Sequence, residues 1–308
     1  MGSKRSLAKK IVNKIRRDNP KATHFYDLFG GGGAISFEAL KWFEHVHYNE
    51  LNTSIVALLE DIRANGVTEK YYQWVSRECF QKNISGDDWF AGLLKTCWSF
   101  GSNQKDYLFG KDIEETKRLA HMAIVDEDEG ALESLGVKKS VLHDGLFDNP
   151  TVYEKMRRFK KHVGGRCDIQ QLERLQQLER LEQLGRLEHL QRLEHLQRLG
   201  QIERLGQIER LHITNKSYDE VAIETPVENT VIYLDPPYKG TKQYEEKVSH
   251  DKIEDFIKNS PYRIYVSSYE WDGLECCMEI NHRSSLSATN NSKKVVEKLF
   301  TNNPGNGR

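Results

Sequence analysis

The amino-acid sequence predicts an α/β fold with an open sheet, interrupted by a long insertion. Near the N-terminus a short apolar strand, a glycine run and a helix follow one another, which is the usual opening of a nucleotide-binding α/β fold. Further apolar strands occur only in the last third of the chain, and a strict hexapeptide repeat precedes them. We therefore expect a discontinuous α/β domain, residues 1–65 and 214–308, and an insertion, 66–213, that carries the repeat at 170–211.

The first half of the α/β domain shows its elements in a clear order. Apolar side chains recur at the spacing of an amphipathic helix in the basic N-terminal segment. The strand, the glycine turn and a second helix come next, and a second strand then ends in an acidic residue before another helix. The expected ranges are 4–17 (helix), 23–29 (strand), 34–45 (helix), 47–50 (strand end) and 52–65 (helix).

The second half is expected to complete the sheet. Val231–Leu234 is a continuous apolar run, which is typical of a strand buried on both faces. Residues 262–268 and 295–300 have the composition of two further strands. Residues 66–168 differ, because they favour helices and are rich in aromatic side chains.

The glycine run is the first candidate binding motif. Gly30–Gly33 follow the strand directly, and glycines at such a turn let the backbone approach a ligand closely while the next helix presents free N–H groups. Glu50 lies about 20 residues further on, where a nucleotide fold places an acid that binds ribose hydroxyls. The alternative is a flexible glycine loop without a ligand.

The second candidate motif is Asp235-Pro236-Pro237-Tyr238, directly after a predicted buried strand. The two prolines fix the backbone and remove two N–H donors. What remains is a rigid pair of acceptors, the Asp235 carboxylate and the Pro236 carbonyl, beside an aromatic ring on which a base can stack. Such acceptors suit an exocyclic amino group, which has two N–H donors. The alternative is a rigid turn with no chemistry.

These segments, in this order, resemble the Dam-like family of adenine-N6 DNA methyltransferases, of phage or prophage type. The family's cofactor motif comes first, its target-recognition region lies in the middle and its catalytic motif comes late. The resemblance covers roughly residues 1–60 and 214–300 and is thin across 66–213. It is carried by Gly2–Arg5, Asp27–Gly33, Asn49–Asn52, Tyr218–Asp219, Tyr233–Tyr238 and Gly240–Thr241 with Tyr244.

The resemblance implies a Rossmann-like sheet that binds S-adenosylmethionine and transfers its methyl group to N6 of an adenine flipped out of duplex DNA. It also implies roles for individual residues. Asp235, Pro236, Pro237 and Tyr238 would hold the target base, and the cofactor would contact Lys4, Phe29, Gly31, Gly33, Glu50, Tyr218 and Asp219. The sequence departs from the family in having Glu at position 50, where Asp is commoner, and in the residues around Lys4.

The repeat places Leu or Ile at every third position from 172 to 211. Three residues fall about 60° short of a full α-helical turn, so the leucine stripe would wind around a helix. A coiled coil needs a mean spacing near 3.5. The strict period therefore favours a solenoid, whereas the Leu, Glu, Gln and Arg composition favours a long helix. We therefore expect a solenoid, with a long helix as the alternative.

The insertion is expected to choose the DNA sequence. Arginine and glutamine read guanine and adenine edges, so the repeat's Arg180, Arg192 and Arg204 are candidate DNA contacts. Seven Glu balance the seven Arg of the repeat, however, and a solvated charged face, a spacer or a dimerisation surface are the alternatives. Outside the repeat, the candidates for DNA contact are Trp98, Phe100 and Asn103, with core packing as the alternative for the aromatic rings.

Composition limits the other possibilities. The net charge of -1 gives no global signal for nucleic acid. The five cysteines lack metal-ligand spacing, and Cys97 is expected to be a buried thiol, so no metal is predicted. No apolar run reaches the ~18 residues of a membrane span, and we expect a cytoplasmic, monomeric enzyme. The alternatives are methylation of cytosine N4 or of an RNA base, and an inactive frame that acts as a repeat-based binding protein.

Overall fold

The computed structural model describes residues 4–100, 103–135, 152, 154–155, 210–237, 249–283 and 294–302. Contacts divide the chain into two compact units. The sheet unit comprises Met1–Arg63, Asp87–Gly92 and Ile202–Arg308, and the insertion unit comprises Ala64–Gly86 and Leu93–Gln201. Of the predicted repeat, only Arg210 and Leu211 belong to the described residues, so both interpretations of its structure remain predictions.

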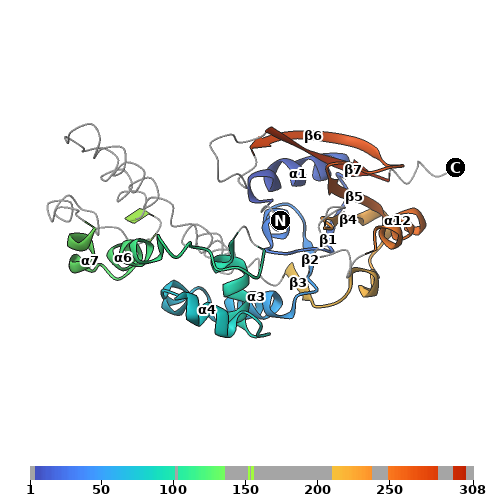
Figure 1. The fold of residues 1–308 in the computed structure, drawn as a ribbon. Helices are drawn as coiled ribbons and strands as arrows, with labels where there is room; N and C mark the ends of the chain where they lie inside the picture. The colour runs from blue at the N-terminus through green and yellow to red at the C-terminus, as the bar shows by residue number, and fades with distance from the viewer. Residues whose placement is uncertain are drawn as a thin grey trace. The chain divides into compact units, whose positions relative to one another are not determined.

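A seven-stranded mixed sheet forms the centre of the sheet unit, in the order β3-β2-β1-β4-β5-β7-β6 (Figure 1). The run from β3 to β5 is parallel, and β7 is antiparallel to both of its neighbours. The α/β class is confirmed, and the strand order is compatible with a Rossmann-like methyltransferase. The strands are β1 His24–Asp27, β2 His45–Asn49, β3 Leu211–Thr214, β4 Thr230–Leu234, β5 Arg263–Ser268, β6 Glu275–Arg283 and β7 Lys294–Thr301.

Helices pack on both faces of this sheet because its central strands are apolar on both sides. All five residues of β4 are buried. On one face, Ile232, Ile264 and Val266 pack with Ile253 and Ile257 of α12 (His250–Asn259) in one apolar cluster. On the other face lies α1 (Arg5–Asp18), whose predicted apolar side is confirmed, since Leu7, Ile11, Val12 and Ile15 are all buried.

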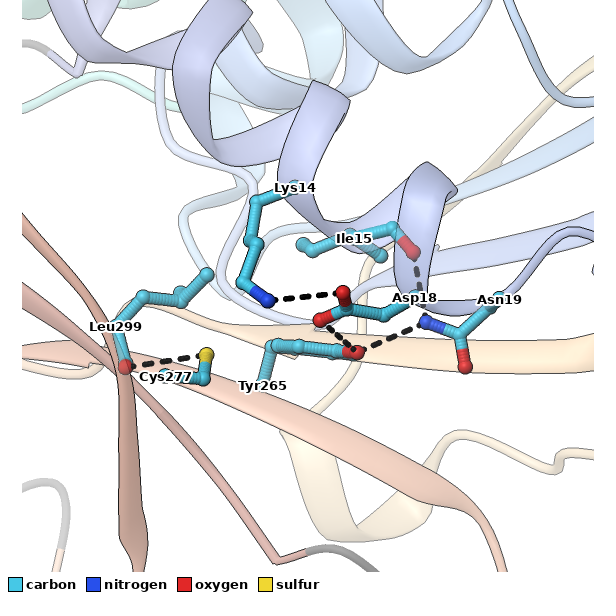
Figure 2. A network of polar contacts seen from close by, with 7 residues as sticks. All are labelled: Lys14, Ile15, Asp18, Asn19, Tyr265, Cys277 and Leu299. Atoms are coloured by element: carbon cyan, nitrogen blue, oxygen red, sulfur yellow. Dashed lines mark hydrogen bonds and ion pairs between the residues drawn. The ribbon is translucent and has the colours of Figure 1, made fainter.

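A polar network fixes the C-terminal end of α1 to the sheet (Figure 2). The Tyr265 hydroxyl, on β5, donates to the Asp18 carboxylate at 3.0 Å and accepts from the Asn19 amide at 2.9 Å. Lys14 forms an ion pair with Asp18 at 2.8 Å, and Asn19 also donates to the Ile15 carbonyl at 2.7 Å. Because an α-helix is a stiff element, this anchor also fixes the other end of α1, where Lys4 precedes the first turn.

The second predicted helix is shorter than expected. α2 spans Ala34–Ala39 only, although the helical spacing continues beyond it. The chain turns at Leu40 and Phe43, which are both buried, and re-enters the sheet at His45. The short helix thus results from burial of the turn. The next helix, α3, spans Thr53–Asn65, close to its predicted range.

The insertion unit has an aromatic core of its own. Trp74 contacts Trp98 edge-on, with ring centroids 5.2 Å apart, and stacks on Phe109 at 5.8 Å. His121 is fully buried against these rings, and this burial lowers its pKa to about 4. The described elements of the insertion unit are η1 Glu69–Tyr72, α4 Arg77–Asn83, η2 Leu94–Trp98, α6 Glu114–Val125 and α7 Glu129–Ser134. Between α4 and η2, helix α5 (Trp89–Leu93) belongs to the sheet unit except for its last residue.

Candidate active site

Both predicted motifs lie at the carboxyl ends of adjacent parallel strands. β1 pairs with β4 so that Asp27 stands opposite Tyr233, and the Leu28 N–H donates to the Tyr233 carbonyl at 3.1 Å. The glycine run therefore starts beside Asp235. β1 is also where the strand order reverses, since β2 and β4 flank it on opposite sides. Ligands of open α/β sheets bind at this position, outside the carboxyl ends of the strands.

The glycine turn is shaped by two aromatic rings. A Cβ on Gly30 would lie 2.1 Å from the Tyr48 ring, and a Cβ on Gly33 would lie 2.1 Å from the Phe37 ring. Gly33 also has a φ of +74°, which favours glycine. A Cβ on Gly31 or Gly32 would meet nothing within 4 Å, so the outer side of the turn is open. The turn thus packs tightly on the protein side and leaves room for a ligand on the other.

Glu50 is bound into the same turn. One carboxylate oxygen accepts from the Gly31 N–H at 2.8 Å and the other from the Asn52 N–H at 2.9 Å. Burial raises the pKa of Glu50, and these backbone hydrogen bonds oppose the rise. Each oxygen retains further acceptor capacity. The carboxylate is therefore oriented and still able to accept ribose hydroxyls.

Asn49, which the sequence analysis did not single out as a site residue, ties the ends of three strands together. Its side-chain amide donates to the Leu28 carbonyl at 3.2 Å and to the Lys216 carbonyl at 3.0 Å. Its side-chain oxygen accepts from the Thr214 hydroxyl at 2.8 Å. These contacts hold the glycine turn, the end of β2 and the segment after β3 in one rigid assembly.

Asp27 is a buried acid beneath the glycine turn. One of its oxygens accepts from the Ser36 hydroxyl at 2.7 Å, while the other has no hydrogen-bond partner among the described residues. The pKa of Asp27 is raised to about 7: burial raises it most, the charges of Asp235 and Glu50 also raise it, and hydrogen bonds from Ser36 and the Phe29 backbone lower it. A cationic ligand would satisfy this site, because it would complete the hydrogen bonding and relieve the mutual repulsion of the carboxylates.

Asp235 follows β4 and meets two charged side chains from distant parts of the chain. The Lys4 ammonium lies 3.2 Å from the Asp235 carboxylate and 2.6 Å from the carboxylate of Glu297 on β7. Burial raises the pKa of Asp235 to about 6, Lys4 lowers it and Glu297 raises it. For Lys4, burial lowers the pKa, but the two carboxylates outweigh it and the pKa is raised. The sequence gives no local signal for Glu297, because the contact joins residues 293 positions apart.

The two prolines after Asp235 are buried, and His250 supports them. Nε2 of His250, the first residue of α12, lies 3.0 Å from the Pro237 carbonyl oxygen, to which its N–H donates in the tautomer that carries the hydrogen on Nε2. Tyr238, the predicted stacking partner of the target base, lies outside the described residues. The described part of the motif is therefore a rigid pair of prolines behind a charged carboxylate.

Phe29 and Tyr218 form an aromatic wall next to the glycine turn. Their rings stack with centroids 5.2 Å apart, and Tyr218 packs edge-on against Phe256 of α12. Asp219 lies in the short helix η5 (Tyr218–Glu220), is exposed, and accepts from the Ser217 hydroxyl. Of the two residues predicted beside the cofactor's adenine, Tyr218 is thus the buried one and Asp219 the solvated one.

The candidate DNA contacts of the insertion unit have different environments. Trp98 is fully buried in the aromatic core, so the prediction that it touches DNA is withdrawn: a side chain without exposed surface cannot contact a duplex. Phe100 is 57% exposed and begins a tight loop, in which Asn103 accepts from the backbone N–H groups of Lys105 and Asp106. Arg180, Arg192 and Arg204 lie outside the described residues.

Within the described ranges, no group of three or more His, Cys, Asp or Glu side chains is arranged to hold a metal ion. Four histidines do gather on one face of β1, β2 and β3, but as stacked rings: His24 lies over His45 at 4.7 Å, and His47 over His212 at 4.8 Å. Nor is any helix in the described part of the chain long and apolar enough to cross a membrane.

Three features meet where the strand order reverses at β1: a glycine turn, an oriented acid and an Asp-Pro-Pro segment. Together they define a class, an α/β enzyme that binds a nucleotide-like cofactor and acts on an amino group. The comparison with protein families names a class of enzyme that fits this description. Residues 1–122 match the model of the D12 class N6 adenine-specific DNA methyltransferases, so the chain is similar to this family over that range. It is a DNA methyltransferase that uses S-adenosylmethionine to methylate N6 of adenine. The search of curated proteins found no match.

The site fits this cofactor. S-adenosylmethionine carries a sulfonium and an ammonium, and the site presents the carboxylates of Asp27, Glu50 and Asp235. The charges of Glu50 and Asp235 raise the pKa of Asp27. The attraction between carboxylates and a cationic ligand is strongest where water is excluded. The open side of Gly31 and Gly32 offers space, and the partnerless oxygen of Asp27 offers an acceptor.

Proposed function

We propose that the carboxyl ends of β1, β2 and β4 form a single active site in which the cofactor and a flipped-out adenine meet. The observation that carries this proposal is the pairing of β1 with β4, which brings the glycine turn next to Asp235. Phe29, Gly31, Gly33, Glu50 and Tyr218 bind the cofactor, which supplies the methyl group. We expect this reaction in the cytoplasm, on double-stranded DNA.

Asp235 holds the target nitrogen in this proposal. Its carboxylate and the Pro236 carbonyl accept the two N–H groups of the adenine amino group, which favours localisation of the nitrogen lone pair toward the methyl group. Because the base must leave the duplex to reach this pocket, unstacking precedes the reaction. Tyr238 stacks on the extruded base. Catalysis then rests on positioning and on fixed charges.

The insertion unit supplies the DNA contacts. Phe100 is exposed at the start of a loop fixed by Asn103, so its ring is free to stack on a base or to wedge between base pairs. Arg180, Arg192 and Arg204 of the repeat are proposed to read base edges. In-frame deletion of two hexapeptides, followed by mapping of the methylated sites, tests this reading. Unchanged specificity and activity of the deletion variant would contradict the proposal that the repeat reads DNA.

The active site is tested with tritiated S-adenosylmethionine and unmethylated duplex DNA, followed by digestion to nucleosides. Label is expected in N6-methyladenine. It should vanish in Asp235→Ala and persist in the control Asp255→Ala, which removes an exposed carboxylate from α12. Label in N6-methyladenine that survives Asp235→Ala would overturn the proposed site. Label in cytosine or RNA instead would overturn the proposed substrate.

A further inference from the structure

The Lys4 ammonium is shared unequally between two carboxylates. It lies 2.6 Å from Glu297 and 3.2 Å from Asp235, and it is itself 8% exposed. The three side chains come from separate places in the fold: the residue before α1, the end of β4 and the middle of β7. The shorter contact belongs to Glu297, which is not part of either motif.

Packing alone does not explain a carboxylate at position 297. Glu297 is 2% exposed and lies on the same face of β7 as Leu299, which is 1% exposed, so an apolar side chain would suit its surroundings. Its sheet neighbour on β6 is Ile280. Burying a carboxylate is unfavourable unless it is paired. A residue that is costly for the fold and lies at the catalytic motif points to a role in the reaction.

The charges suggest what this role is. If Lys4 were paired with Asp235 alone, its ammonium would largely neutralise the carboxylate that must accept hydrogen bonds from the target amino group. Glu297 draws the ammonium toward β7, so that two carboxylates share it. The groups that act electrostatically on Asp235 or share its surroundings include Lys4, Glu297, Asp27, Tyr233, Tyr269 and the N-terminal amino group.

We propose that Glu297 is a positioning residue for methyl transfer: it holds the Lys4 ammonium toward β7, so that this ammonium does not occupy the Asp235 carboxylate oxygens that accept the target amino group. This inference rests on the proposed role of Asp235. Glu297 acts through Lys4 and touches neither the cofactor nor the base. Its removal should therefore alter turnover and its pH dependence while cofactor affinity stays the same.

The test compares Glu297→Gln, which keeps the shape and an acceptor for Lys4, with Glu279→Gln, the same change at an exposed position on β6 of the same ribbon. In Glu297→Gln, kcat should fall about tenfold, as expected for a displaced catalytic charge, with an unchanged dissociation constant for S-adenosylmethionine. The acidic limb of the pH profile of kcat should move to lower pH, because the charge of Glu297, which raises the pKa of Asp235, is gone while Lys4, which lowers it, remains. Lys4→Met should move this limb to higher pH, and Glu297→Asp should recover part of kcat.

A readout without catalysis uses the unfolding of the cofactor-free protein. The raised pKa of Asp235, about 6 against 3.8 when unfolded, makes stability fall as pH rises from about 4 to 6. This fall should be smaller in Glu297→Gln than in Glu279→Gln. If Glu297→Gln does not fold, Lys4→Met with Glu297→Gln, which removes the Lys4 ammonium together with the carboxylate nearest to it, is compared with Lys4→Met. Equal kcat in these two variants supports action through Lys4, and a further loss contradicts it.

The outcomes separate the two proposals. Suppose that Glu297→Gln keeps the wild-type kcat and the wild-type acidic limb of the pH profile, while Asp235→Ala is inactive. This result would overturn the role of Glu297 and leave the proposed active site standing. An active Asp235→Ala would overturn the active site itself. A loss in Glu297→Gln that comes from weaker cofactor binding would also contradict a positioning role.

Discussion

Replacing Gly33 by alanine should destabilise the sheet unit without adding any bulk to the open side of the pocket. The backbone at Gly33 has a φ of +74°, and an L-residue there costs roughly 1–2 kcal/mol. The new Cβ would lie 2.1 Å from the Phe37 ring, against an ordinary contact of about 3.5–4.0 Å. Phe37 is buried, so its ring must shift against its neighbours, and such overpacking adds about 1–3 kcal/mol. The expected total is about 2–5 kcal/mol.

Calorimetric unfolding of the cofactor-free protein measures this loss. For a unit of this size, about 1 kcal/mol lowers Tm by roughly 2–4 °C. The control is Gly32→Ala, where a Cβ meets nothing within 4 Å and no positive φ is required, so Tm should hardly change. Titration with S-adenosylmethionine should show weaker binding by Gly33→Ala, because the turn must shift. Equal Tm values for the two variants would refute the reasoning about the turn.

Three further predictions follow from buried and exposed side chains. In Asp27→Asn, stability should rise relative to wild type as pH increases from 4 to 8, by up to the order of 4 kcal/mol, because the raised pKa of Asp27 makes the native protein favour its protonated form; pH-dependent urea unfolding checks the sign. Tyr265→Phe should lower the free energy of unfolding by about 1–2 kcal/mol, since the hydroxyl bridges Asp18 and Asn19 (Figure 2); the same urea unfolding assay measures the loss. Phe100→Ala should weaken DNA binding by about 1–3 kcal/mol without loss of stability, whereas Trp98→Ala should lose about 3–5 kcal/mol of stability; DNA titration and calorimetry distinguish the two.

The parts of the fold that the sequence predicted are those with a strong local pattern. β1 and β4 are apolar runs that end in specific motifs, and α1 has a continuous apolar side. β3 was missed because Leu211 also continues the every-third-residue pattern, which hides the change of structure. β6 was missed because Glu275–Arg283 mixes polar and apolar residues, as an edge strand does.

The site was predictable only where its residues belong to motifs. Asp235, Glu50 and the glycines stand at fixed positions after strands, and strand pairing then brings them together. Glu297 lies in a run that also suits a half-exposed strand, and its role depends on a contact with Lys4 across the whole chain. Trp98 was predicted to contact DNA because it is an aromatic residue near a loop. It is fully buried and packs in the core of the insertion unit.

The strand order also explains how this fold tolerates so long an insertion. The chain leaves the sheet after β2 and returns at β3, which is the edge strand and pairs with β2 in parallel. A parallel pair requires a crossover connection in any case, and here that connection holds α3 and everything up to residue 210. Closure of a long loop becomes only about 0.6 kcal/mol more costly when its length doubles. Removal of two hexapeptides should therefore leave the pairing of β2 with β3, and with it cofactor binding, unchanged. A loss of cofactor affinity in that variant would mean that the repeat supports the sheet itself, and that its sequence is kept for folding and not for the choice of DNA site.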